Sequence, residues 1–85
     1  MDDGQLTLNK DIANFVETAW RELFGATAIR PSDSFFDLGG TSMAAVKFIT
    51  AIEREFGLDA LSPEELYEDP AFGSIVSVIG KNASL

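Results

Sequence analysis

The chain has 85 residues, enough for one small domain with a single core. Hydrophobic residues make up 46% of it and include seven Phe, which is sufficient for a compact fold and argues against disorder. Cys and His are both absent from the sequence. Their absence excludes disulfides, thiolate nucleophiles, the common zinc frameworks and the usual general base near neutral pH. A surface function is therefore expected rather than an enzyme that acts alone.

The charge is strongly negative, with 14 acidic against 6 basic residues and a formal net charge of −8. Such a charge repels nucleic acids and anionic membranes and attracts a protein with a basic docking patch, although it also simply keeps a small protein in solution. No apolar run approaches about 18 residues, and the N-terminus lacks a signal-peptide pattern. We expect a soluble, cytoplasmic monomer that binds neither nucleic acid nor membrane.

The first helical pattern begins at Asn9 and ends before Gly25. Its apolar residues recur at steps of three and one, which places them on one stripe: Ile12, Phe15, Val16, Ala19, Trp20, Leu23 and Phe24. Asn9 or Thr7 is expected to cap the start, and residues 1–8 are expected to fray. Trp20 is expected to pack in the core rather than to form a binding platform.

Residues 25–41 show no sustained period and predict a long loop. Pro31 disfavours helix at Arg30, and loops of this length are usually functional or disordered. Four apolar side chains favour an ordered loop that is tied to the helices: Ile29, Phe35, Phe36 and Leu38. At least one of the two phenylalanines should be buried.

A second helical pattern spans residues 42–56 and ends before Gly57. Its core-facing arc is Ala45, Phe48, Ile49, Ile52 and Phe56. Met43 lies roughly opposite this arc, and Val46 lies on its flank. One exposed Met is unremarkable, but two apolar side chains within one turn favour a contact with a partner protein.

Residues 62–65, which read Ser-Pro-Glu-Glu, are typical of a helix start, and Pro70 ends this helix after about two turns. Leu66 and Tyr67 are expected to pack inward. The acids of this helix, Glu64, Glu65 and Glu68, are expected to face water rather than to bind a metal.

The last helix is expected to open at residues 71–73 and to end near Gly80, with an apolar face of Phe72, Ile75, Val76 and Ile79. No segment predicts a strand convincingly. The expected fold is a single all-α domain over residues 1–85, a small four-helix bundle of three longer helices and one short helix. Its folded core is expected over about residues 9–80.

Ser42 lies at the start of the second helix, beside unsatisfied backbone N–H groups and the positive end of the helix dipole. This position favours a phosphate ester, whether free or attached to the hydroxyl. Gly39 and Gly40 would allow a tight approach to the helix and leave the hydroxyl unshielded. A simple N-cap formed by Ser42 or by Thr41 explains the same residues equally well.

A catalytic role for Ser42 is not favoured, because a nucleophilic Ser needs a base and an orienting group. Without His, the base would have to be Lys47 or Asp37, and neither is expected to be desolvated in so small a domain. The sequence around Ser42 also lacks the preceding strand of a nucleophile elbow and the GK[ST] ending of a phosphate-binding loop. The hydroxyl is predicted to be modified by another protein. A helical interaction module with simple Ser phosphorylation is a further hypothesis.

Residues 35–57, FFDLGGTSMAAVKFITAIEREFG, are followed by LYEDPAF at residues 66–72. These two segments, in this order, resemble the thiolation domains, or peptidyl carrier proteins, of nonribosomal peptide synthesis, within the acyl-carrier-protein-like superfamily. The resemblance covers roughly residues 12–79. The positions that fit are Asp33, Phe35, Phe36, Leu38, Gly39, Gly40, Ser42, Ala45, Ile49, Ile52, Leu66, Tyr67, Pro70 and Phe72.

The resemblance implies a carrier without catalytic activity of its own. Ser42 would receive 4'-phosphopantetheine from coenzyme A through a phosphopantetheinyl transferase, with Gly39, Gly40 and Thr41 around the attachment site. The thiol of this arm would hold an amino acid or peptide as a thioester. Met43, Val46 and Lys47 would form the docking surface for adenylation, condensation, tailoring or thioesterase enzymes, with the short acidic helix opposite.

Thr41 departs from the family pattern, which commonly has His or Asp before the Ser. The cargo class is therefore open between peptidyl carriers and the acyl or aryl carriers of polyketide-type pathways, and the Leu38-Gly39-Gly40 segment favours the peptidyl side. The short tails fit both a stand-alone carrier and a domain excised from a synthetase.

Overall fold

The computed structural model describes the backbone of residues 3–83 and the side chains of residues 10–83. Within these residues the chain forms four helices: α1 (Asp3–Phe24), α2 (Ser42–Phe56), α3 (Pro63–Glu68) and α4 (Phe72–Ala83). Residues 3–83 contain no strand, and one isolated antiparallel bridge joins Ser34 to Ala71. The prediction of an all-α bundle with three longer helices and one short helix is confirmed.

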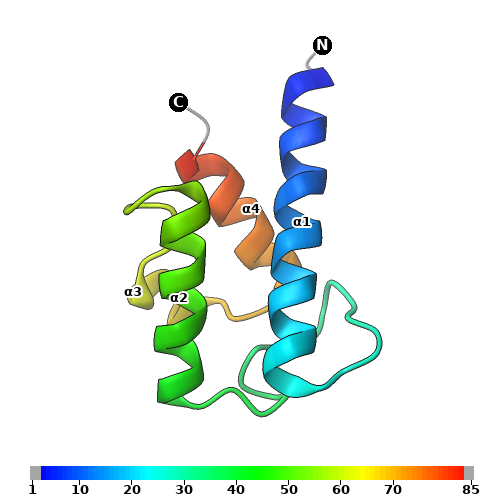
Figure 1. Ribbon diagram of the computed structural model, residues 1–85, viewed down its shortest axis with the longest axis vertical. Coiled ribbons are helices and arrows are strands. Elements are labelled where there is room, and N and C mark those ends of the chain that lie inside the picture. Colours follow the sequence, from blue (N-terminus) through cyan, green and yellow to red (C-terminus); the bar gives the residue numbers. More distant parts are fainter. Residues whose placement is uncertain (1–2, 84–85) are drawn as a thin grey trace.

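Helices α1 and α2 run antiparallel to one another (Figure 1), and their contact includes an edge-to-face pair between Phe15 and Phe56 with ring centroids 5.4 Å apart. Helix α4 packs chiefly against α1, and α3 packs against α4. The described parts of α1 and α4 begin and end, respectively, at the opposite end of the bundle from the start of α2 (Figure 1). The N-terminus of α2 is therefore left free of these chain ends.

Among residues 10–83, fourteen apolar side chains are buried in the core, and they come from all four helices and their connections. Trp20 lies at its centre, fully buried, with edge-to-face contacts to Phe24, Phe35, Phe48 and Phe72 at centroid distances of 5.4–6.2 Å. Each such pair adds about 0.5–1.5 kcal/mol beyond the burial of its area. The predicted core role of Trp20 is confirmed. Of the arc predicted for α2, Ala45, Phe48, Ile49 and Ile52 are buried and Phe56 is half-buried.

The start of the first helix, α1, and the end of the last helix, α4, differ from the sequence expectation. Helix α1 begins at Asp3, so the expected start at Asn9 with a cap at Asn9 or Thr7 is wrong. The apolar stripe marks only the packed part of a helix, and residues such as Gln5 and Leu6 have helix propensities close to that of Ala. Residues 3–8, which were also expected to fray, form the first turns of this helix, and the fraying expected of residues 1 and 2 lies outside the described residues.

Helix α4 continues past Gly80 to Ala83, so its expected end near Gly80 is also wrong. Its last turn is anchored by Asn82, whose Nδ2 donates hydrogen bonds to the carbonyl oxygen of Ala60 at 3.1 Å and to the Glu65 carboxylate at 3.1 Å and 3.2 Å. Polar contacts of this kind leave no trace in the apolar periodicity from which the helix end was predicted.

Helix α3 has six residues, and it buries Leu66 fully, as expected. Tyr67 was expected to pack inward, but it is 52% exposed because so short a helix offers only one side to the core. Glu65 was expected to face water, but it is half-buried and forms a capping box with Ser62. Glu64 and Glu68 are exposed, as expected.

Candidate functional site

The loop before Ser42 is fastened to the connection between α3 and α4 by backbone hydrogen bonds. The N–H of Phe35 donates to the carbonyl of Pro70 at 2.9 Å, and the N–H of Phe72 donates to the carbonyl of Asp33 at 2.8 Å. Asp33 also stiffens the loop locally, because its Oδ2 accepts the Arg30 N–H at 2.9 Å. Two segments that are far apart in sequence thus hold each other in place. These contacts restrict the conformation of the loop that leads into α2.

Phe35 is the apolar anchor of this loop and is fully buried. Its ring stacks on Phe48 of α2 with centroids 5.5 Å apart and meets Trp20 edge-to-face at 5.6 Å. Phe36 and Leu38 are half-buried against the same core. The loop is therefore ordered, and the prediction that at least one phenylalanine is buried is confirmed.

Gly39 and Gly40 have different reasons to be glycine. Gly39 has φ +111°, a conformation that L side chains rarely adopt. Gly40 lies so close to Phe35 that an added Cβ would be 2.3 Å from its ring and 2.6 Å from its carbonyl oxygen. The backbone can therefore pass tightly over Phe35 into α2.

Helix α2 is capped by Thr41, whose Oγ1 accepts the backbone N–H of Ala44 at 3.1 Å. The carbonyl of Thr41 accepts the N–H of Ala45 at 2.9 Å. Ser42 is the first residue of the helix and is exposed. Of the two capping alternatives that the sequence left open, the structure thus selects Thr41.

Although Thr41 caps α2, other backbone N–H groups at the start of this helix remain available to a ligand. Helix geometry gives the first N–H groups no intrahelical partner, and Thr41 satisfies the one of Ala44. The N–H groups of Ser42 and Met43 point out of the helix end, and no acidic side chain lies in the first turn to neutralise its dipole. A phosphate ester on the Ser42 hydroxyl fits this arrangement, because its negative charge would lie beside the positive end of the dipole.

The residues expected to form a docking surface lie in the first two turns of α2. Met43 is 70% exposed and Val46 is 61% exposed, so both point outward as the helical pattern predicted. Lys47 is exposed as well, one turn further along α2. Side chains this apolar and this exposed, grouped within two turns, fit a contact surface for another protein.

Sequence reasoning missed a second aromatic contact at this site. Phe36 of the loop stacks nearly parallel on Tyr67 of α3, with centroids 5.2 Å apart and planes inclined by 9°. The pair joins α3 to the loop that leads to Ser42. Because its two members are 31 positions apart in the chain, no local pattern could have indicated it.

Two further classes of site find no support among the described residues. Residues 10–83 contain no cluster of acidic side chains that could hold a metal ion. No helix in the part of the chain that the structure describes is long and apolar enough to cross a bilayer.

Sequence similarity relates the chain to several known proteins. The family described as "Phosphopantetheine attachment site" matches residues 14–79, which span the second half of α1, all of α2 and α3, and most of α4. Nonribosomal peptide synthetase asaC of Aspergillus flavus is 35% identical over 69 residues, and surfactin synthase subunit 1 of Bacillus subtilis is 31% identical over 64 residues. A phenolphthiocerol/phthiocerol polyketide synthase chain of Mycobacterium tuberculosis is 31% identical over 64 residues.

These relatives are far larger proteins. The matches cover 81%, 75% and 75% of this chain but only 7%, 2% and 4% of the respective relatives. The chain thus corresponds to a small part of each relative. No solved structure gives a significant match.

Proposed function

The chain belongs to the phosphopantetheine attachment site family, whose members carry 4'-phosphopantetheine, and on this premise we propose that Ser42 is the residue that bears the arm. The observation that carries the proposal is the exposed hydroxyl at the first position of α2, which Thr41 relieves of the capping role. The Ser42 oxygen would form the bond to phosphorus and lose its proton, and the adenosine 3',5'-bisphosphate part of coenzyme A would leave.

The other residues of the site would position this hydroxyl rather than react. Phe35 holds the loop, Gly40 allows the close passage, and Thr41 fixes the first turn. The N–H groups of Ser42 and Met43 would face the phosphodiester. The arm supplies a thiol that forms a thioester, and the chain itself would contribute no catalytic group.

We propose an aminoacyl or peptidyl cargo in nonribosomal peptide synthesis. The Leu38-Gly39-Gly40 segment supports it, and the relative from Aspergillus flavus is named a nonribosomal peptide synthetase. The second candidate is an acyl or aryl cargo of a polyketide-type pathway. It is favoured by the polyketide synthase relative, and Thr41 before Ser42 leaves the choice between the two cargo classes open.

The partners would be a phosphopantetheinyl transferase, an adenylation enzyme that activates the amino acid, and condensation, tailoring or thioesterase enzymes that use the thioester. Met43, Val46 and Lys47 would form the docking surface, because they lie within two turns of the proposed attachment site and are exposed. The carrier itself would act as a monomer.

The attachment site is tested by incubation with coenzyme A and a broad-specificity phosphopantetheinyl transferase, followed by intact mass measurement. The wild-type protein should gain one arm. Ser42→Ala should gain none, while Ser62→Ala, which alters the other Ser at a helix start, should still gain one. A wild-type protein that remains unmodified while a control carrier is loaded would contradict the proposal.

The cargo is tested by offering the arm-bearing protein to amino-acid-activating and acyl-activating enzymes in parallel. Thioester formation with the first class, read out by mass, supports the peptidyl assignment. Loading by acyl-activating enzymes alone would favour the second candidate.

A further inference from the structure

Helix α3 depends on its neighbours for its position. Isolated helices shorter than about 12 residues are marginal in water, and α3 has six residues. Leu66 is fully buried and anchors the inner face of this helix in the core. Two further contacts, one polar and one aromatic, tie α3 to α4 and to the loop that leads into α2. The orientation of α3 is therefore set by these three points.

The polar contact joins the start of α3 to the last turn of α4 through Asn82. Its side-chain amide carries two N–H groups. They donate to the carbonyl oxygen of Ala60 at 3.1 Å and to the two oxygens of the Glu65 carboxylate at 3.1 Å and 3.2 Å. The same carboxylate accepts the backbone N–H of Ser62 at 3.0 Å. Asn82 thus holds both the connection that precedes α3 and the residue that closes its cap.

The aromatic contact joins α3 to the loop that leads into α2. The ring of Tyr67 stacks on Phe36 of this loop, with centroids 5.2 Å apart and planes inclined by 9°. The carbonyl of Phe36 in turn accepts the N–H of Gly39 at 3.2 Å. Gly39 lies two residues before Thr41, the cap of α2. A displacement of α3 would therefore act on the backbone that leads to the proposed attachment site.

Building on the proposed function, we infer that Asn82 is a positioning residue for the attachment site. It holds α3 in the orientation in which Tyr67 stacks on Phe36, and this stack fixes the conformation of residues 36–41. The buried Phe35 anchors the inner side of the loop without help from α3. Loss of the Asn82 contact should therefore leave the fold intact and loosen only the outer part of the loop.

The first test compares backbone amide chemical shifts of the unloaded wild type, Asn82→Ala and Ile79→Val, with urea unfolding of each. Ile79→Val removes one buried methylene from the same helix and controls for a loss of stability alone. Asn82→Ala should shift the amides of residues 36–41 as well as those of residues 60–66, although its hydrogen bonds reach only residues 60 and 65. Ile79→Val should leave residues 36–41 unchanged. Shifts confined to residues 60–66 in Asn82→Ala would overturn the inference.

A second substitution shows whether the effect is transmitted through the aromatic stack. In a Tyr67→Ala background, which removes the ring from Phe36, adding Asn82→Ala should no longer shift the amides of residues 36–41. Shifts that persist at full size in this background would overturn the role of the stack.

An exchange of donor and acceptor tests the polar contact itself. Asn82→Asp keeps the size of the side chain but places a second carboxylate against Glu65, so it should disturb residues 36–41 as Asn82→Ala does. Combining it with Glu65→Gln restores a hydrogen bond in the opposite direction and should return these shifts toward the wild-type values. A double variant no closer to wild type than Asn82→Asp would contradict a role through Glu65.

The second test measures transfer of the arm by a broad-specificity phosphopantetheinyl transferase over a series of carrier concentrations. A loosened loop has to be ordered when the enzyme binds. Asn82→Ala should therefore raise the KM for the carrier about two- to fivefold and change kcat by less than about a factor of two. Ile79→Val should change neither constant. An unchanged KM in Asn82→Ala would show that the contact does not position the attachment site.

The outcomes separate this inference from the function on which it rests. If the wild-type protein gains no arm while a control carrier is loaded, the proposed function and the role of Asn82 in loading both fail. If the wild type is loaded but Asn82→Ala matches Ile79→Val in its loop shifts and in its KM, only the positioning role of Asn82 fails.

Discussion

Helices α2 and α3 are both capped at their N-terminus by a hydroxyl side chain, but they differ in how far the remaining N–H groups and the helix dipole are compensated. At α3, Ser62 caps the helix, Pro63 opens it, and the first turn holds Glu64 and Glu65. The Ser62 hydroxyl accepts the Glu65 N–H at 3.1 Å, and the Glu65 carboxylate accepts the Ser62 N–H at 3.0 Å. This helix end thus satisfies two of its own N–H donors and places acidic side chains against its own dipole.

At α2, Thr41 provides a single capping contact and the first turn contains no acid. Ser42 comes one position after the cap, so its hydroxyl is not used to satisfy the helix. The comparison shows that a Ser at a helix start is not by itself a functional signal. Under the proposed function, what distinguishes Ser42 is that another hydroxyl residue takes the cap position and that the charge of the helix end is left uncompensated.

The largest loss of stability is expected from a substitution in the loop that leads into α2. The start of α2 depends on this loop, whereas the start of α3 depends mainly on residues 62–65. Gly40→Ala would place a Cβ 2.3 Å from the Phe35 ring and should destabilise the protein by about 1–3 kcal/mol. Gly73→Ala is the control, because its Cβ would meet Pro31 at ordinary distances of 3.4 Å or more within a helix. It should be neutral or stabilising by up to about 1 kcal/mol. Urea unfolding measures both, and equal effects would contradict the packing role of Gly40.

Removing the cap of α2 or of α3 should distinguish effects on folding stability from effects on the transfer of the arm to Ser42. Thr41→Val and Ser62→Ala should each destabilise by about 0.5–2 kcal/mol, because each exposes a helix N–H group. Only the Thr41 variant should also slow transfer of the arm to Ser42, and Thr41→Ser should restore both properties. Loading rates followed by mass, together with urea unfolding, provide the measurement. An equal loading rate in both cap variants would show that the cap does not position Ser42.

A smaller effect is expected when α2 is given the acid that α3 already has. Met43→Glu places a carboxylate in the first turn of α2 and should stabilise the helix by about 0.3–1 kcal/mol relative to Met43→Gln. The same charge competes with the incoming phosphate, so loading should be about two- to fivefold slower than for Met43→Gln. The Gln variant controls for loss of the apolar side chain at the docking surface. Faster loading of the Glu variant would mean that the charge of this helix end does not act on the phosphate.

Most of the bundle could be predicted because its helices carry their apolar stripes in consecutive turns. The buried arc of α2 and the core position of Trp20 follow directly from a period of 3.6 residues. The attachment of the loop to the helices could also be predicted, because its aromatic side chains favour burial against the core. The resemblance to carrier proteins indicated the family from two sequence segments alone.

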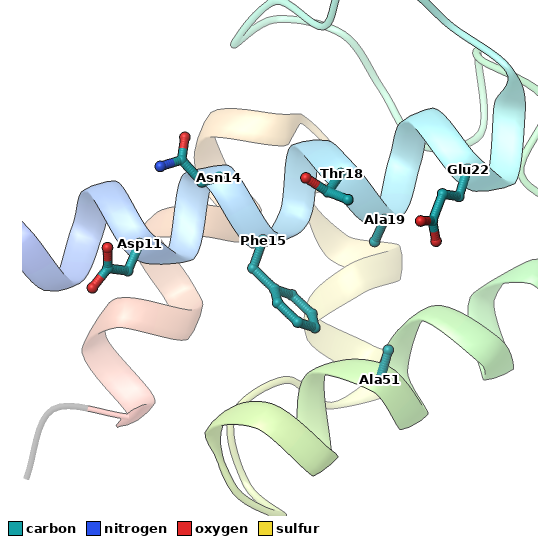
Figure 2. A pocket seen from close by; sticks show the side chains of 7 residues that line it. All are labelled: Asp11, Asn14, Phe15, Thr18, Ala19, Glu22 and Ala51. Carbon is teal, nitrogen blue, oxygen red and sulfur yellow. The ribbon is translucent and has the colours of Figure 1, made fainter.

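What could not be predicted depends on contacts between distant positions. The last turn of α4 is held by Asn82 on Ala60 and Glu65, and Tyr67 is held flat on Phe36 at the surface. The choice between Thr41 and Ser42 as cap is local, yet it depends on backbone dihedral angles that either residue could have adopted. The pocket between α1 and α2, which is lined by Phe15 and Ala19 from α1 and by Ala51 from α2 (Figure 2), has no signature in either helix alone.

The smallest effect is expected from the pH dependence of the α3 cap. The backbone N–H of Ser62, with the amide of Asn82, holds the pKa of Glu65 below its usual value despite partial burial. A lowered pKa in the folded state contributes stability above the unfolded pKa of about 4.3, and this contribution is lost as the pH falls through the folded value. Glu65→Gln, which still permits a capping box, should therefore be less stable than wild type at pH 7, and the difference should shrink toward pH 3. Urea unfolding at both pH values measures this difference in stability, with the exposed Glu64→Gln as the control. A difference that persists at pH 3 would assign the role of Glu65 to packing rather than to its charge.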